Sequence, residues 1–161
     1  MISGISWTVL AVEESKVLVL ADKTVAEKPY NKTCKEVTWE TCTLRKWLNE
    51  DFYNKFSEKE KGMIVEVNNT NPENDLSGVK GGNDTKDRIF VFSLDDMEHY
   101  YWGVVIGRTD NFGEYWRLRT PGKELRQALV VNPDGSILDD DECWVEFAYG
   151  IRPAMWIKKM C

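Results

Sequence analysis

The 161-residue sequence predicts one α+β domain with mostly antiparallel strands, two main helices and long irregular loops. Residues 5–12 and 16–21 are apolar segments separated by a short polar stretch, which is typical of a β-hairpin. Residues 44–56 place their large apolar side chains at helical spacing. From residue 88 onward, short strand-like segments alternate with turn residues. Helices in the first two-thirds, followed mainly by strands, indicate the α+β class.

In the first third, residues 16–21 are apolar on both faces, so we expect them to form a central strand. The helix over 44–56 should bend near Asn49 and Asp51, which are weak helix formers. Ser57 and Glu60 have the spacing of a capping box, which predicts a second, short helix that ends at Gly62.

The middle of the chain alternates apolar segments with one long polar segment. Residues 63–67 and 88–93 are predicted strands, and the second should be buried. Between them lie about twenty residues rich in Asn, Asp and Gly, and irregular loops of that length are often functional. Ser93 and Asp96 repeat the capping pattern, so a short helix should follow.

The last third predicts strands over 115–119 and 144–149, with Pro121 and Gly122 ending the first of them. The sequence NPDG at 132–135 predicts a hairpin turn with Gly135 in the left-handed conformation. Pro153 predicts that the last segment is an edge strand or an interrupted one. Both ends of the chain are strand-like and can pair with each other.

Composition and charge exclude several classes of protein. Hydrophobic residues make up 42% of the chain, which is enough for a substantial core. The net charge of −6 repels phosphate groups, so no nucleic-acid partner is expected. No apolar run approaches the roughly 18 residues of a membrane helix, and the first residues lack a signal-peptide pattern. We therefore expect no membrane insertion, and a cytoplasmic protein unless a targeting segment has been removed.

Cysteine and acidic residues give no clear metal site. Cys34, Cys42, Cys143 and Cys161 form no CxxC pair, so free thiols are expected rather than zinc ligands, and their redox state stays open. No cofactor is predicted. Calcium is the alternative, with Asp84 and Asp87 as candidate ligands after the flexible Gly81-Gly82 pair. The acidic run at 139–142 is interpreted as a solvated surface.

The aromatic and arginine clusters supply the candidate ligand-binding residues. On a strand over 115–119, Trp116 would face the core while Tyr115 and Arg117 face the other side. Those two could contact a ligand, or the arginine could bond backbone carbonyls instead. The aromatic cluster at 99–103 has two interpretations: it forms a binding patch, or its side chains close the core. The candidate set for ligand binding is Tyr100, Tyr101, Trp102, Arg108, Tyr115 and Arg117.

A second set of residues is assigned structural roles: Trp47, Trp116, Arg119 and Arg152. Each of the two arginines precedes a proline within two positions, where it can bond carbonyls that the missing N–H leaves unpaired. Asp87 or Glu40 is the expected carboxylate partner. No catalytic residue is predicted. A Ser–His or Cys–His nucleophile pair would need His99 as its base, since it is the one histidine, and such a residue more often lies on the surface.

Four ordered segments carry a family resemblance that covers nearly the whole chain. They are TWETCTLRKWLNEDFYNKFSEKEKGMI, NDTKDRIFVFSLDDMEHYY, WRLRTPG and GIRPAMWI. Together they resemble a bacterial and phage family of domains of unknown function with WWLR[ST]PG and G[IV]RPA motifs. Arg117 departs from that pattern, since it replaces the second Trp of WWLR. The resemblance implies a C-type-lectin-like fold, related to formylglycine-generating enzymes, with paired terminal strands.

Three functions follow as hypotheses. The first is a non-catalytic recognition module that presents residues 68–86 and 99–117 to a glycan, peptide or protein. The second is a hydrolase-like enzyme with an acid-based site that the sequence does not reveal. The third is a structural accessory domain of a phage or surface assembly. The oligomeric state stays open.

Overall fold

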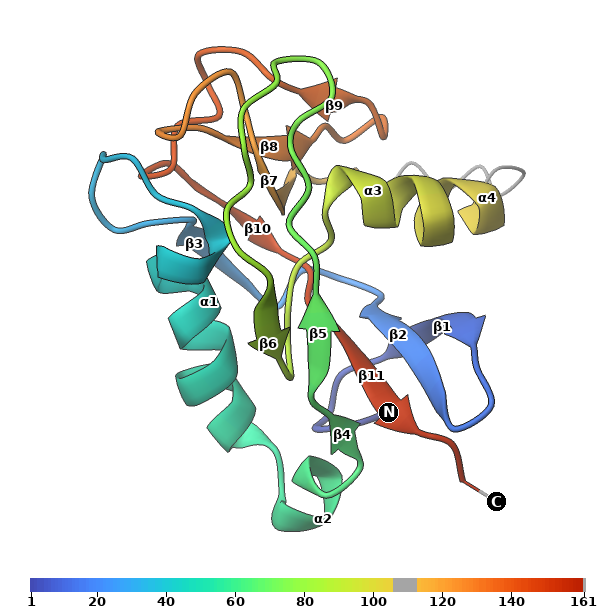
Figure 1. Cartoon of the computed structure of the whole chain (residues 1–161). Coiled ribbons are helices and arrows are strands. Elements are labelled where there is room, and N and C mark those ends of the chain that lie inside the picture. Colours follow the sequence, from blue (N-terminus) through green and yellow to red (C-terminus); the bar gives the residue numbers. More distant parts are fainter. Residues whose placement is uncertain (106–112, 161) are drawn as a thin grey trace.

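The computed structural model describes residues 1–105 and 113–160, which form two β-sheets, a small two-stranded ladder and two main helical segments (Figure 1). The strands are β1 (Trp7–Val12), β2 (Lys16–Ala21), β3 (Ala26–Pro29), β4 (Ile64–Val65), β5 (Val67–Asn69), β6 (Thr85–Asp87), β7 (Trp116–Pro121), β8 (Ala128–Val131), β9 (Ile137–Leu138), β10 (Ala148–Ile151) and β11 (Ala154–Lys158). The helical elements are η1 (Trp39–Thr41), α1 (Thr43–Trp47), η2 (Leu48–Phe52), η3 (Tyr53–Lys55), α2 (Glu58–Lys61), α3 (Leu94–Asp96), η4 (Met97–Tyr101) and α4 (Trp102–Val105). Over these ranges, no helix is long and apolar enough to cross a membrane.

The first sheet joins the two ends of the chain in the order β1-β2-β11-β4. The predicted N-terminal hairpin is confirmed, and β2 is central with residues 18–21 buried. Because β11 pairs antiparallel with β2, the expected pairing of the terminal strands is also confirmed. Pro153 falls in the gap between β10 and β11, so the interrupted-strand alternative is correct. The edge-strand alternative is wrong, because β11 lies between β2 and β4.

The second sheet has the order β3-β10-β7-β8-β9, and only the β10–β7 pair is parallel. The predicted hairpin is β8–β9, and Gly135 in its turn has a φ of 89°. Position 135 thus needs glycine, because side chains rarely tolerate this φ. The predicted strand over 144–149 is wrong for residues 144–147: Trp144 makes one isolated bridge to Gln127, and residues 145–147 form a turn. The carbonyls of Trp144 and Phe147 accept hydrogen bonds from a buried arginine.

The first main helical segment runs through α1, η2 and η3 and covers the core with one face. Leu44, Leu48, Phe52 and Phe56 are buried along that face, as their spacing predicts. The expected irregularity near Asn49 is a π-helical turn, η2. Asn49 lies in that turn and donates to the carbonyls of Arg45 and Ile89, so its side chain ties the helix to the segment that follows β6. The irregularity therefore has a structural use.

Both predicted capping boxes are present. Ser57 accepts from the backbone N–H of Glu60 at the start of α2, and Gly62 is the C-cap. Ser93 accepts from the N–H of Asp96 at the start of α3, which continues through η4 into α4. A cap contributes about 1 kcal/mol to helix stability. The positions of these helices are therefore set by local sequence.

Residues 88–93 differ from the prediction in one respect. Residues 89–93 are buried, and Arg88 is exposed, but the segment does not form a regular strand. Phe90 makes one isolated bridge to Ala154. The N–H of Ile89 bonds the side chain of Asn49 instead of a neighbouring strand. The Asn49 side chain thus replaces a neighbouring strand as the hydrogen-bond acceptor, and the buried N–H of Ile89 is satisfied without a sheet.

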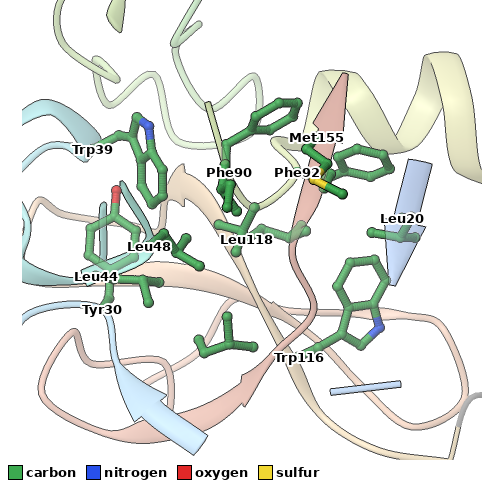
Figure 2. Packing of buried hydrophobic residues seen from close by; sticks show 14 of the residues in the cluster. Leu20, Tyr30, Trp39, Leu44, Leu48, Phe90, Phe92, Trp116, Leu118 and Met155 are labelled. Atoms are coloured by element: carbon green, nitrogen blue, oxygen red, sulfur yellow. The ribbon is translucent and has the colours of Figure 1, made fainter. Parts of the chain in front are cut away.

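The core lies between the two sheets and the α1–η2 segment (Figure 2). Trp39, Trp116 and Leu118 are fully buried in it, so Trp116 faces the core as the strand pattern predicts. Trp47 is half-buried and packs against this core from its edge. Among the described cysteines, Cys42 and Cys143 are buried free thiols and Cys34 is an exposed one.

The buried thiol of Cys42 predicts a loss of stability in alkali. Burial raises its pKa from an ordinary value of 9.0 to about 12. The thiol is therefore protonated in the folded chain at a pH where the unfolded chain has lost the proton. The resulting stability is complete below pH 9 and is lost between pH 9 and about 12. From pH 8 to pH 10 we expect Cys42 alone to lower the free energy of unfolding by about 1 kcal/mol.

Urea unfolding under reducing conditions at pH 8 and pH 10 measures this change, and Cys42→Ala should remove its share. The pH range stops at 10 because burial lowers the pKa of Arg117 to about 10, which has the opposite effect on stability above that pH. An equal pH dependence in Cys42→Ala and the unsubstituted protein would contradict the assignment.

Candidate functional site

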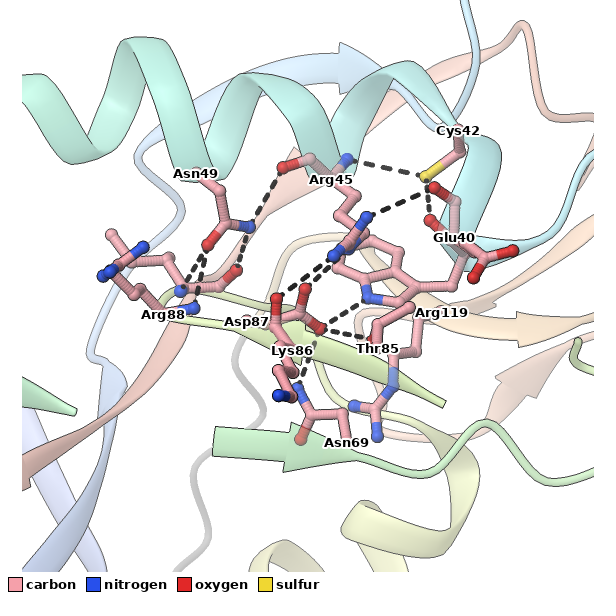
Figure 3. A network of polar contacts seen from close by, with 12 residues as sticks. Glu40, Cys42, Arg45, Asn49, Asn69, Thr85, Lys86, Asp87, Arg88 and Arg119 are labelled. Atoms are coloured by element: carbon pink, nitrogen blue, oxygen red, sulfur yellow. Dashed lines mark hydrogen bonds and ion pairs between the residues drawn. The ribbon is translucent and has the colours of Figure 1, made fainter. Parts of the chain in front are cut away.

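The long polar segment predicted as a loop is anchored at its end by a buried carboxylate (Figure 3). Asp87 is fully buried and accepts hydrogen bonds from four side chains. The donors are Trp39 Nε1 at 2.9 Å, Arg45 Nε at 2.6 Å, Asn69 Nδ2 at 3.0 Å and Thr85 Oγ1 at 2.8 Å. These bonds join η1, α1, β5 and β6, so the β5–β6 ladder is fixed against the first helical segment.

The two candidate calcium ligands do not converge in the structure. Asp87 has its carboxylate surrounded by donors, whereas Asp84 is exposed and accepts from Asn68 at 3.3 Å. Within residues 1–105 and 113–160, no group of three or more His, Cys, Asp or Glu is placed to hold a metal ion. The structure therefore assigns Asp87 to the internal network.

Arg119 is buried, and its carboxylate partner differs from the prediction. Its guanidinium pairs with Asp96 at 2.5 Å, and neither Asp87 nor Glu40 is the partner. It also donates to Asn71 Oδ1 at 3.0 Å and to the carbonyls of Val91 and Thr70 at 2.8 and 3.0 Å. Arg119 therefore links the start of α3 to the start of the long polar segment. Further along that segment, Gly81 lies so close to Asn71 that a Cβ would be 2.4 Å from its carbonyl oxygen.

Arg117 is buried, and its burial contradicts an exposed ligand-binding role. Its guanidinium donates to the carbonyls of Ala128, Cys143, Trp144 and Phe147 at 2.6–3.2 Å. The guanidinium also lies 4.8 Å from the centroid of Tyr149. The interpretation in which Arg117 faces a ligand is wrong, because residues 116–121 are buried on both faces. The alternative role, bonding of backbone carbonyls, is the one seen.

Tyr101 is likewise turned toward the interior. It is 7% exposed, and its ring packs edge-on against Trp116 with centroids 5.4 Å apart. Arg152 donates to the Tyr101 hydroxyl at 3.2 Å and to the carbonyl of Ala21 at 2.7 Å. Tyr101 therefore closes the core, which is the second of the two interpretations of this cluster, and Arg152 joins Tyr101 to the end of β2.

The remaining candidates are separated from one another. Trp102 is partly buried against the core. Tyr115 is 45% exposed and packs against Tyr149 with centroids 5.8 Å apart, on the second sheet. Arg108 lies outside the described residues. Of the predicted ligand-binding residues that the structure describes, only Tyr100 lines the groove described next.

A groove of about 530 Å³ lies between the first sheet, β5 and the α3–η4 helix. We call it the β5–α3 groove. Its apolar wall contains Phe90, Tyr100 and Trp156, and its charged residues are Glu13, Lys16, Glu66, Asp95, Asp96, His99 and Arg119. Residues from 13 to 156 thus meet in one place, because β2 and β11 are neighbours and β4 continues into β5.

Two of the three rings in the apolar wall, those of Tyr100 and Trp156, are in edge-to-face contact. Tyr100 and Trp156 have centroids 6.2 Å apart and an interplanar angle of 84°. The ammonium of Lys16 lies 4.9 Å from the centroid of Trp156, within cation–π range. The groove therefore already holds one cation against an aromatic ring, and that cation belongs to the protein itself.

Negative charge dominates the groove. Four carboxylates face two permanent cations, which gives a formal charge of −2 when His99 is neutral. Burial raises the pKa of Tyr100, and the negative charges of Asp96, Glu13 and Asp95 raise it further, so three of these carboxylates act on one phenol. The pKa of His99 is also raised, chiefly by its hydrogen bond to the Asp95 carbonyl at 2.9 Å.

Sequence reasoning missed most of this groove. The sequence pattern places Trp156 only in a terminal strand, and it assigns no role in binding to Glu13, Lys16 or Glu66. Because side chains alternate along a strand, the sequence could have indicated that Trp156 lies on the opposite face of the last strand from its neighbours Met155 and Ile157. However, the partners on that face depend on strand order, which no local pattern contains.

The fold and the groove define a mixed helix-and-sheet domain with mostly antiparallel strands and an acidic, aromatic groove at one end of its first sheet. Residues 14–159 match the family described as a domain of unknown function, DUF6273, and the chain belongs to that family. No curated protein and no solved structure matched the chain.

Proposed function

We propose that the protein is a non-catalytic recognition module whose β5–α3 groove binds a basic segment of a peptide or protein. The observation that carries the proposal is the combination of two aromatic rings with a net negative charge in one open groove. Lysine and arginine side chains have an apolar stem that packs on aromatic rings and a charged end that pairs with carboxylates.

The charge of the whole chain supports the same ligand class. A net charge of −6 attracts basic partners and repels acidic ones before contact is made. Lys16 over Trp156 is a cation of the type that the ligand would bring. A neutral glycan would use the rings but would gain nothing from the surplus of carboxylates, so the groove favours a peptide or protein ligand over a glycan.

We further propose that the fold is C-type-lectin-like. The pairing of an N-terminal hairpin with the C-terminal strand supports this proposal, as does the long irregular segment that leads from β5 to β6. In such a scaffold the irregular region carries the binding surface, and here Thr70, the first residue of that region, lines the groove beside residues 65–69 of the β4–β5 segment. A C-type-lectin-like fold and the groove are therefore consistent with one recognition function.

The test uses three fluorescent nonapeptides of equal length: one rich in Lys and Arg, one rich in Asp and Glu, and one neutral. We expect the basic peptide to bind at least tenfold more tightly than the neutral one at low salt, and the acidic peptide not to bind. The double variant Glu66→Gln/Asp95→Asn should weaken binding about tenfold, since each exposed charge pair contributes up to about 1 kcal/mol.

Glu27→Gln/Glu36→Gln is the matched control, because it changes the net charge equally at exposed residues outside the groove. Equal weakening by the two double variants would show non-specific attraction and overturn the assignment to the groove. Mass spectrometry of the peptide after incubation tests the non-catalytic part, which cleavage of the peptide would contradict. Binding of neutral glycans on an array, without peptide binding, would overturn the proposed ligand class and show that the ligand is a glycan.

A further inference from the structure

A second hollow, of about 490 Å³, lies beside Trp47 between β3 and the α1–η2 helix. These two elements lie side by side in Figure 1. Its charged residues are Lys28, Lys32, Lys46, Glu50 and Asp51, and none of these residues lines the β5–α3 groove. We call this hollow the Trp47 pocket.

Lysine side chains gather at the indole ring of this pocket. The ammonium of Lys28 lies 4.7 Å from the centroid of Trp47, and that of Lys55 lies 5.8 Å from it. Trp47 is half-buried, so its ring is fixed by the core at one edge and accessible at the other. An ammonium over an exposed indole gains about 0.5–1 kcal/mol, and the two ammonium groups repel each other.

These lysines have no carboxylate partner in the described ion pairs. Salt bridges within residues 1–105 and 113–160 use other lysines, and Lys28, Lys32, Lys46 and Lys55 take part in none of them. Three of these lysines, Lys28, Lys32 and Lys46, line the pocket, and Lys55 lies over the same indole, so this part of a chain with a net charge of −6 offers ammonium groups that an anion can pair with.

The pocket also contains groups that select among anions. Glu50 and Asp51 line it and are exposed, so their carboxylates can accept hydrogen bonds from hydroxyl groups. Those carboxylates repel a peptide rich in Asp and Glu. A bare inorganic anion would make no use of the indole. A sugar that carries a carboxylate has all the complementary parts: an acid group for the lysines, hydroxyl donors for the acids, and a C–H face for the ring.

We propose that the Trp47 pocket binds a saccharide bearing a carboxylate, such as a uronic acid. The carboxylate pairs with the ammonium groups of Lys28 and Lys46, and the sugar ring packs on Trp47. Hydroxyl groups of the sugar donate to Glu50 and Asp51. This site does not depend on the proposed binding of basic peptides in the β5–α3 groove.

The test compares three probes by calorimetry and by the indole N–H signal of Trp47 in NMR spectra. The probes are an oligomer of galacturonic acid, the same oligomer with its carboxylates methyl-esterified, and inorganic phosphate. Trp47→Phe identifies the indole signal. We expect the acidic oligomer to shift that signal and to bind at least tenfold more tightly than the ester. Lys28→Met/Lys46→Met should weaken its binding at least fivefold, and Lys46→Met alone, at an exposed position, should weaken it about threefold.

Lys35→Met/Lys59→Met is the matched control, because both lysines are exposed, lie outside the pocket and have no described ion pair. This control should leave the affinity within about twofold of the original. Equal binding of acid and ester would overturn the proposal, as would phosphate binding as tightly as the oligomer. An unshifted Trp47 signal in the presence of bound oligomer would also overturn it.

Discussion

Replacement of Asp87 by Ala is expected to lower the free energy of unfolding by about 3–5 kcal/mol, a large part of the stability of a domain of this size. The substitution leaves buried donors without an acceptor, above all Trp39 Nε1 and Asn69 Nδ2, and removes the partner of Arg45. Urea unfolding followed by tryptophan fluorescence measures the change. Asp87→Asn keeps the volume but not the charge, and it should still cost more than half of the Asp87→Ala effect.

Glu73→Ala is the control for this experiment. Glu73 lies on the same polar segment and pairs with Lys80, but both side chains are exposed. Exposed pairs contribute little, so this variant should stay within about 0.5 kcal/mol of the original protein. A loss below about 1 kcal/mol in Asp87→Ala would show that the four hydrogen bonds do not hold the fold together.

Replacement of Arg119 by Met is the second substitution with a large expected effect, again about 3–5 kcal/mol. Arg119 is 3% exposed, and its loss removes the cation that pairs with Asp96 and leaves the buried carbonyl of Val91 and the partly buried carbonyl of Thr70 without this donor. Hydrogen exchange should also become faster at the amides of residues 69–71, because the bonds to Thr70 and Asn71 are lost. Arg119→Lys should recover only part of the stability, since an ammonium cannot reproduce the planar set of donors.

Arg126→Met supplies the comparison for Arg119. Arg126 is half-exposed and lies 3.9 Å from Glu124, so its removal should change stability by less than about 0.5 kcal/mol. If Arg119→Met unfolded at the same urea concentration as Arg126→Met, the guanidinium would have no structural role. Unchanged exchange at residues 69–71 in a destabilised variant would contradict the link between β7 and the polar segment.

Elements defined by local chemistry could be predicted from the sequence. The capping boxes at Ser57 and Ser93 join residues that are three positions apart, and the hairpin turn depends on the positive φ of Gly135. The irregular turn near Asn49 was also foreseeable, because Asn is a weak helix former. In each case the cause and the structure lie within a few residues of each other.

Partnerships across the chain could not be predicted in the same way. Arg119 pairs with Asp96 because β7 passes the start of α3, and the sequence contains no measure of that distance. Residues 88–93 have the composition of a strand, yet the side chain of Asn49 takes the bond of Ile89. Tyr100 and Tyr101 are neighbours in sequence but differ by about 100° in direction on a helix, so one lines the groove and the other closes the core. The sequence indicated the aromatic cluster without showing which ring faces which way.

The position of β11 between β2 and β4 has a consequence for synthesis on the ribosome. Both neighbours leave the ribosome long before β11 is made, and each then has an edge without hydrogen-bond partners. Pairing of Val19 with Met155 closes a loop that contains most of the chain, so this sheet should be completed late and slowly. Until then the nascent chain exposes strand edges that promote aggregation, and a chaperone that shields β2 should increase the yield of folded protein.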